Sequence, residues 1–118
     1  MNNSFPSQML TPFMLWADAA PALWQVADGP ICLALFSTRE NAARYAARMG
    51  IDPSTAEQLE AQPFVELLVE CFRSEVRWAV LDPEDRYAKK LFDLADVLRR
   101  VREELRFGGT LNFDVGAN

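Results

Sequence analysis

Three carboxylates within four residues come closest in this sequence to a reactive group: Asp82-Pro83-Glu84-Asp85. Carboxylates grouped in this way can bind Mg²⁺ or Ca²⁺, or share the work of acid and base between them. The D-x-D-x-D-G spacing of a calcium loop is absent, and the same residues suit a helix start, with Asp82 as N-cap and Pro83 in the first turn. We therefore predict capping here, and we assign no catalytic, metal-binding or cofactor-binding residue from the sequence.

The sequence contains no histidine, which removes the Ser-His and Cys-His pairs of many hydrolases and the imidazole ligands of zinc. It also lacks the P-loop, G-x-G-x-x-G and G-x-S-x-G motifs. A net charge of −5 without a basic block disfavours binding to nucleic acid or to an anionic membrane surface. The apolar stretch Phe13–Ala17 is far too short to span a bilayer and no signal peptide precedes it, so we expect a cytoplasmic protein.

Cys32 and Cys71 stand 39 residues apart, each within an apolar run and outside any C-x-x-C arrangement. Unpaired cysteines in apolar runs are usually buried structural thiols. We predict that role for both, since a disulfide needs a proximity that the sequence does not show.

A chain of 118 residues, half of them apolar, is long enough to bury a core of its own. We predict a single α+β domain over residues 1–118, with residues 1–11 as a loose lead-in. Its small, mostly antiparallel sheet has about three to five strands covered by helices. Leu23–Ala27 and Ile31–Phe36 flank an Asp-Gly-Pro turn and predict a hairpin whose second strand is central, and Val76–Leu81 predicts a later strand.

Three helices are predicted from their end signals and their apolar spacing. Ser37-Thr38-Arg39-Glu40 forms a capping box before an alanine-rich helix that Gly50 ends. Phe64–Arg73 is so apolar that we expect a helix nearly enclosed by the core. A long C-terminal amphipathic helix is expected to begin at Asp82 and to end near Phe107.

The last helix carries the strongest functional signal. Its apolar residues are spaced 4-3-4-3-4, the period of a coiled-coil seam, and they are Tyr87, Leu91, Leu94, Leu98, Val101 and Leu105. Thr110–Val115 alternates polar and apolar side chains and predicts an edge strand, which adds Phe113 to the candidate interaction surface. The stripe either packs on the chain's own sheet or contacts a second copy or another protein, and the tail strand pairs either within its own chain or with a neighbour.

Two further groups have alternative interpretations. The segment from Glu57 to Glu75 holds five Glu against one Arg, which indicates either a solvated acidic face or a docking surface for a basic partner. The three tryptophans are core or rim residues, unless they gather with Phe13 into a ligand or partner patch on one sheet face. They are Trp16, Trp24 and Trp78.

The stretch Leu33-Ala34-Leu35-Phe36-Ser37-Thr38, followed by Glu40-Asn41-Ala42 and Tyr45-Ala46, resembles the SseB protein N-terminal domain family. That family has a hairpin entering an "LPLF-[ST]-[ST]" strand, an alanine-rich helix, and a later strand ending in an "-NP" or "-DP" turn, which Val80-Leu81-Asp82-Pro83 matches. The similarity covers roughly Leu23 to Pro83; Ala34 stands where the family usually has Pro, and the closing helix is longer. The resemblance implies a bacterial α+β accessory domain and carries over no catalytic residue.

Two functions are consistent with this acidic chain. We favour a non-enzymatic bacterial accessory or protein-interaction domain that acts through self-association, as a homodimer, or through a protein partner. The alternative is a small-molecule-binding protein or a carboxylate-based enzyme, which needs two carboxylates converging in a cleft with the pKa of one of them raised. The sequence identifies no ligand.

Overall fold

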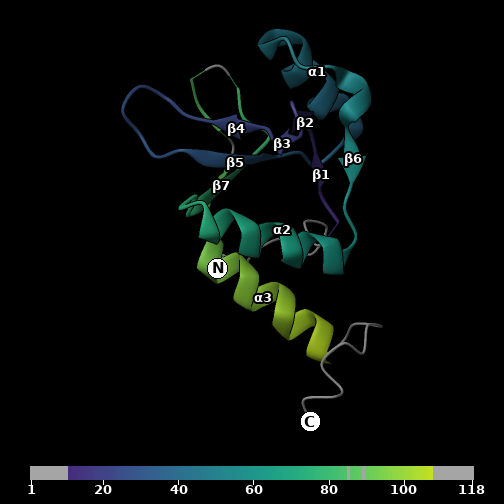
Figure 1. Ribbon diagram of the computed structural model, residues 1–118, viewed down its shortest axis with the longest axis vertical. Helices are drawn as coiled ribbons and strands as arrows, with labels where there is room; N and C mark the ends of the chain where they lie inside the picture. Colours follow the sequence, from purple (N-terminus) through teal and green to yellow (C-terminus); the bar gives the residue numbers. More distant parts are fainter. Residues whose placement is uncertain (1–10, 85, 89, 108–118) are drawn as a thin grey trace.

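A four-stranded sheet forms the centre of the molecule in the computed structural model, which describes residues 11–84, 86–88 and 90–107 (Figure 1). The strand order is β4-β5-β7-β8; the outer pairs are antiparallel, whereas β5 and β7 are parallel. The strands are β4 (Leu23–Trp24), β5 (Cys32–Leu35), β7 (Trp78–Leu81) and β8 (Lys90–Asp93). The predicted α+β class, the hairpin and the central position of its second strand are confirmed.

Four shorter strands form two small antiparallel pairs beside this sheet. They are β1 (Phe13–Met14) with β6 (Glu57–Gln58), and β2 (Trp16–Ala17) with β3 (Ala20–Pro21). β1 also attaches to the end of β5, because Phe13 and Phe36 exchange two backbone hydrogen bonds of 2.9 Å. The N-terminal part of the chain is thereby fixed to the central sheet.

The parallel pair of β5 and β7 requires a long crossover, because parallel strands cannot be joined by a tight turn. The crossover contains α1 (Arg39–Met49), the 3-10 turn η2 (Pro53–Thr55), β6 and α2 (Ala61–Arg73). β5 can lie between two neighbours because all four of its residues are apolar and buried.

Successive residues of β5, together with Phe36 directly after it, supply two cores on opposite faces of the sheet. Leu33 and Leu35 face α2 and α3 (Leu94–Phe107), which pack against each other on one side. Ala34 and Phe36 face α1, whose alanines allow the helix to approach closely. Figure 1 shows α1 and α2 on opposite sides of the sheet, so helices cover both faces.

α1 begins one residue later than predicted. Thr38 is the N-cap, since its Oγ1 accepts the Asn41 N–H at 3.0 Å, and Gly50 ends the helix with a left-handed φ of 71°. The predicted capping box of Ser37 and Glu40 is therefore wrong. The Ser37 hydroxyl instead donates to a carboxylate that follows another strand.

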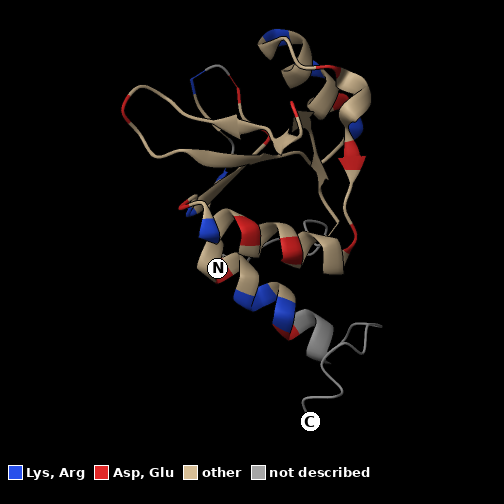
Figure 2. Cartoon of the chain, viewed as in Figure 1, with Lys and Arg blue, Asp and Glu red and all other residues tan. Residues whose placement is uncertain are grey.

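α2 is less enclosed than its composition predicts. Phe64, Leu68 and Cys71 are buried, whereas its other apolar residues are half-buried. Glu66 and Glu70 lie on its exposed side, and Figure 2 shows acidic residues along the visible side of this helix. The expectation of a nearly enclosed helix is therefore wrong: α2 lies at the surface with one buried side.

The predicted long helix from Asp82 is the main error in the expected fold. Asp82 has a left-handed φ of 51°, the described residues between it and β8 are not helical, and α3 begins at Leu94. α3 is capped by Asp93, whose Oδ1 accepts the Ala95 N–H at 2.9 Å. Local spacing does not reveal this start, because β8 is stabilised by its pairing with the distant strand β7.

Both cysteines are buried free thiols, as the sequence predicts. Burial raises the pKa of the Cys32 thiol. Burial also raises the pKa of Cys71 to about 11, and the nearby Glu70 carboxylate adds to that shift. Cys71 is therefore a neutral, weakly nucleophilic thiol near neutral pH.

We expect iodoacetamide at about pH 8 to alkylate Cys71 roughly a hundredfold more slowly in the native protein than in the urea-unfolded chain. The reason is that a rise in the pKa from 9.0 to about 11 lowers the fraction of reactive thiolate by about that factor. Peptide mass mapping gives both rates, and equal rates contradict the burial of Cys71. Folding favours the neutral thiol of Cys71. The contribution of this thiol to the free energy of unfolding is therefore complete below about pH 9 and is lost as the pH rises through about 11.

Candidate functional site

The carboxyl ends of β5 and β7 lie next to each other because the two strands are parallel. Ser37 follows the end of β5 and leads into α1, while Asp82 follows β7 directly. In open sheets with helices on both faces, ligands bind outside the carboxyl ends of parallel strands. This end of the sheet is therefore the natural position for a binding site.

Asp82 joins the two strand ends. It is 8% exposed and is the one charged residue that is buried in the described part of the chain. Its N–H donates to Leu35 O at 2.8 Å, and its carboxylate accepts the Ser37 N–H at 3.0 Å and the Ser37 Oγ–H at 2.7 Å. The chain turns here through a left-handed conformation, which Asp tolerates better than most residues.

Two further side chains extend this connection into α1. Asn41 Nδ2 donates to Ser37 Oγ at 3.4 Å, and Asn41 Oδ1 accepts from Arg44 Nη1 at 3.1 Å. Hydrogen bonds therefore run in one direction from the Arg44 guanidinium through Asn41 and Ser37 to the Asp82 carboxylate. A buried charge needs such partners, and these hold α1 against the end of β7.

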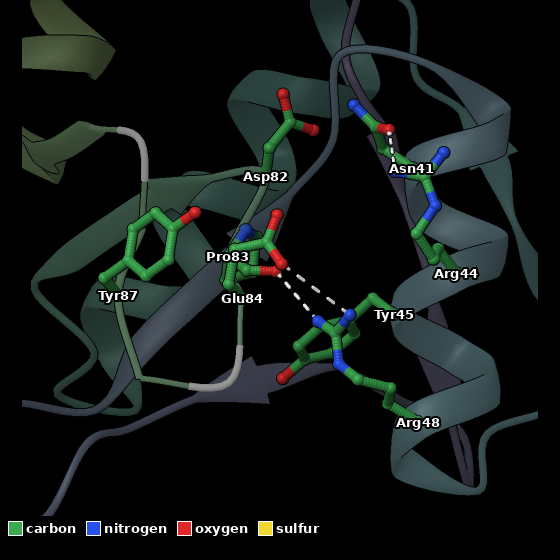
Figure 3. Close-up of a pocket in the computed structure, with 8 residues that line it drawn as sticks. All are labelled: Asn41, Arg44, Tyr45, Arg48, Asp82, Pro83, Glu84 and Tyr87. Atoms are coloured by element: carbon green, nitrogen blue, oxygen red, sulfur yellow. Dashed lines mark hydrogen bonds and ion pairs between the residues drawn. The ribbon is translucent and has the colours of Figure 1, made fainter.

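A cavity of about 170 Å³ lies beside this network, between α1 and the segment that follows β7 (Figure 3). Successive turns of α1 supply one wall and the segment after β7 supplies the other. The lining residues are Asn41, Arg44, Tyr45 and Arg48 on α1, and Asp82, Pro83, Glu84 and Tyr87 opposite them.

Tyr45 connects this cavity to the core. Its ring centroid lies 5.3 Å from that of Phe36, and its hydroxyl donates to Leu23 O at 3.0 Å. Burial raises the pKa of the Tyr45 hydroxyl, and the Arg48 charge partly opposes that shift. The hydroxyl is therefore a proton donor that holds β4 against α1, and it is unsuited to act as a base near neutral pH.

Arg48 lines the cavity and contacts the segment after β7. Its Nη2 donates to Pro83 O at 3.3 Å, and its Nη1 lies 3.8 Å from Glu84 Oε1. Trp24 Nε1 donates to Glu84 O at 2.7 Å and fixes the same segment to β4. A second cavity of about 170 Å³ is also lined by Tyr45, Arg48 and Glu84, so these residues form the wall between the two cavities.

The cavity is suited to binding more than to acid–base chemistry. Asp82 and Glu84 both line it, but the Asp82 carboxylate is already bound by Ser37. Among the described residues, no three Cys, Asp or Glu side chains are placed to hold a metal ion. The guanidinium groups of Arg44 and Arg48 also line the cavity, and guanidinium groups bind oxyanions.

The predicted interaction surface divides between core and exterior. Leu94 and Val101 are completely buried, and Leu98 is half-buried and packed against the same core. Tyr87 and Leu91 precede α3 and are 65% and 53% exposed. The first three residues thus belong to the chain's own core, whereas Tyr87 and Leu91 face solvent.

Two members of that surface cannot be placed with the others. The side chain of Leu105 and the predicted tail strand Thr110–Val115, with Phe113, lie outside the residues that the structure describes. The acidic segment contributes Glu66 and Glu70 to the exposed side of α2, where Glu70 lies 3.5 Å from Arg73.

The tryptophans are half-buried and form no single patch. Cys32 on β5 pairs with Trp24 on β4 and with Trp78 on β7, so the two tryptophans share one face of the sheet. Trp16 lies in β2, where its Nε1 donates to Glu57 Oε1 at 2.8 Å.

Sequence reasoning misses the basic side chains of the site. Arg44 and Arg48 stand one turn apart on a helix whose Ala42 and Ala46 face the core, and that spacing predicts a shared basic face. The Asp-Pro pair directly after a buried strand is ambiguous, because it suits a strand end as well as a helix start.

No family model matches this chain, and no curated protein matches it. In the part of the chain that the structure describes, no helix combines the length and the apolar character needed to cross a membrane.

The connection between Ser37 and Asp82 predicts a large effect on stability. We expect Asp82→Ala to lower the free energy of unfolding by about 2–4 kcal/mol, because it removes hydrogen bonds to a buried charge and leaves alanine at a positive φ. In a double-mutant cycle, Ser37→Ala and Asp82→Ala should couple by about 1 kcal/mol or more. Urea denaturation followed by circular dichroism measures all four free energies.

Asp52 and Ser54 provide a matched control. The Asp52 carboxylate accepts from the N–H and the hydroxyl of Ser54 in the same way, but the pair is exposed and local. Removing this pair should destabilise the protein less than removing the buried one. Equal losses at the two pairs, or no coupling between Ser37 and Asp82, contradict the structural role assigned here.

Proposed function

We propose that this chain is a non-enzymatic interaction domain that self-associates through the open edge of β8. The observation that carries the proposal is the edge itself: among the described residues β8 pairs with β7 alone, and its other side has no strand. Leu91 on β8 is 53% exposed, and the nearby Tyr87 is 65% exposed. Open edges with exposed apolar side chains are preferred places for another strand to add.

The pairing of β8 supports this choice of edge. Leu94 N donates to Arg77 O at 2.9 Å, and Phe92 lies opposite Ala79. Backbone groups of an antiparallel strand alternate between its two sides, so those of Leu91 and Asp93 point away from β7. They are the groups that a further strand would bind.

A second copy is the partner that fits this edge most simply. Two antiparallel β8 strands related by a two-fold axis at Leu91 place each Leu91 beside its counterpart, and the two sheets become one. β8 has only four residues, so the contact is small and the dimer should dissociate on dilution.

We further propose that the protein is a bacterial accessory domain similar to the SseB N-terminal domain family and that it works in the cytoplasm. The family-like stretch from Leu33 to Thr38 coincides with β5 and the start of α1, and Asp82-Pro83 follows β7 as the "-DP" turn follows a strand in that family. Two buried free thiols suit a reducing compartment.

Small-molecule binding is the second candidate function. The cavity lined by Arg44 and Arg48 favours it, because it offers cationic donors in a concave site. A carboxylate-based enzyme has less support, because both oxygens of the Asp82 carboxylate already accept hydrogen bonds from Ser37.

Light scattering on a gel-filtration column, over a wide dilution range, tests self-association. We expect a dimer fraction that rises with concentration, and Leu91→Arg should weaken the dimer at least about tenfold because it sets two like charges opposite each other. Ile31→Arg is the matched control, since Ile31 is also an exposed apolar residue, 47% exposed, away from β8. Leu94 is unsuitable for the test because it is completely buried.

Three outcomes count against the β8 edge: a monomer at every concentration, a dimer that Leu91→Arg leaves unchanged, or equal effects of Leu91→Arg and Ile31→Arg. Circular dichroism on each variant separates loss of the contact from loss of the fold.

A further inference from the structure

We propose that the two cavities along α1 form one binding site for a small organic acid with an apolar tail. Arg44 and Arg48 hold the carboxylate head, and the apolar tail lies over β4 and the end of α1. This site shares Tyr87 with the surface beside β8, but its arginines lie on α1, and the inference does not depend on self-association.

The head of the ligand is recognised by two guanidinium groups. Arg44 and Arg48 are four residues apart and therefore lie on the same side of α1, where two like charges repel unless an anion lies between them. Among the described residues no carboxylate forms an ion pair with Arg44, whose Nη1 donates to the amide oxygen of Asn41. The rest of its planar group can bind an oxyanion.

Glu84 occupies the position that the ligand carboxylate would take on Arg48. The nitrogen and oxygen of this pair are 3.8 Å apart, and both side chains are partly exposed, so the contact contributes little to stability. In Figure 3 Glu84 approaches Arg48, whereas the Asp82 carboxylate points away from it and is held by Ser37. Among the described carboxylates, a ligand carboxylate therefore competes for Arg48 only with the weakly held one of Glu84.

Arg48, Glu84 and Tyr45 line both cavities, and displacement of the weakly paired Glu84 side chain would open the wall between them. Each cavity has a volume of about 170 Å³. Their combined volume reaches the lower end of the usual range for small-molecule pockets, roughly 300 Å³. The joined groove follows α1 from Asn41 toward Met49.

The far part of this groove is apolar. Leu23 and Met49 line it and are 43% and 56% exposed, so both present apolar surface to a molecule bound there. Trp24 also lines it, and its indole N–H already donates to Glu84 O, so the remainder of the ring is an apolar surface. The polar end and the apolar end thus match an acid that carries one ring or a short branched chain.

The network at the strand ends places Arg44 before any ligand arrives. Asn41 accepts from Arg44 and donates to Ser37, which is bound to Asp82. A donor that is already oriented loses less conformational freedom on binding. Asn41 and Ser37 are therefore positioning residues in this site.

Isothermal titration calorimetry of the full chain with benzoate tests the proposal. Benzamide has the same ring without the charge, and acetate has the charge without the ring. We expect saturable binding of benzoate at one site with a dissociation constant on the order of millimolar, and binding of benzamide and acetate at least about tenfold weaker.

Variants locate the binding. Arg44→Gln and Arg48→Gln should each weaken benzoate binding about tenfold or more, as expected for loss of a charge-assisted hydrogen bond. Arg73→Gln on α2 is the control and should leave it unchanged. Glu84→Gln removes the competing carboxylate while keeping the backbone oxygen that Trp24 binds, so we expect severalfold tighter binding.

The proposal is overturned if benzoate fails to bind at about 10 mM, if benzamide or acetate binds as well as benzoate, or if Arg73→Gln weakens binding as much as Arg44→Gln. Weaker binding by Glu84→Gln also overturns it, because Glu84 would then assist the ligand. If an arginine variant fails to fold, salt titration of the unmodified chain replaces it: benzoate binding must weaken with added salt, and binding indifferent to salt excludes the arginine pair.

Discussion

The hydrogen bonds between Ser37 and the Asp82 carboxylate are the constraint on which the rest of the molecule depends. Parallel strands β5 and β7 are separated in sequence by the whole crossover, so no local turn holds their ends together. The buried carboxylate does so from the end of β7, where it accepts two hydrogen bonds from Ser37, the residue at which the chain leaves β5 for α1. The start of α1, and with it the side chains that α1 presents, is therefore set from the neighbouring strand.

The candidate site follows from this arrangement. Because α1 begins at Arg39, two residues after Ser37, its polar side runs along the segment after β7, and Arg44 and Arg48 line the cavity together with Glu84. Trp24 holds that segment from β4, so three elements position one cavity. The weak contact within it, between Arg48 and Glu84, is also the contact that a ligand can replace without disturbing the bonds of Asp82.

Local signals predict the parts of this fold that local interactions decide. The hairpin, α1 with its Gly50 end and the buried strand before Asp82 all follow from apolar runs and end residues. The start of the last helix does not, because Asp-Pro-Glu-Asp has the composition of a helix cap while pairing with β7 turns Lys90–Asp93 into a strand. Ser37 is assigned to the wrong partner for the same reason. Ser37 and Thr38 are both suitable N-caps in sequence, and only the folded chain brings the Asp82 carboxylate to Ser37 and leaves Thr38 to cap α1.

The cavity is harder to predict than the fold, because its residues come from two segments about forty positions apart. Neither segment by itself indicates a binding site. Arginines on an alanine-rich helix are usually solvated, and the spacing of Tyr87 in the sequence assigns it to the apolar stripe of a helix. Tyr87 both lines the cavity and contributes exposed surface near the β8 edge, so a substitution of Tyr87 affects both proposed surfaces. Leu91 and Arg44 each belong to one surface, and for that reason self-association and ligand binding can be separated by experiment.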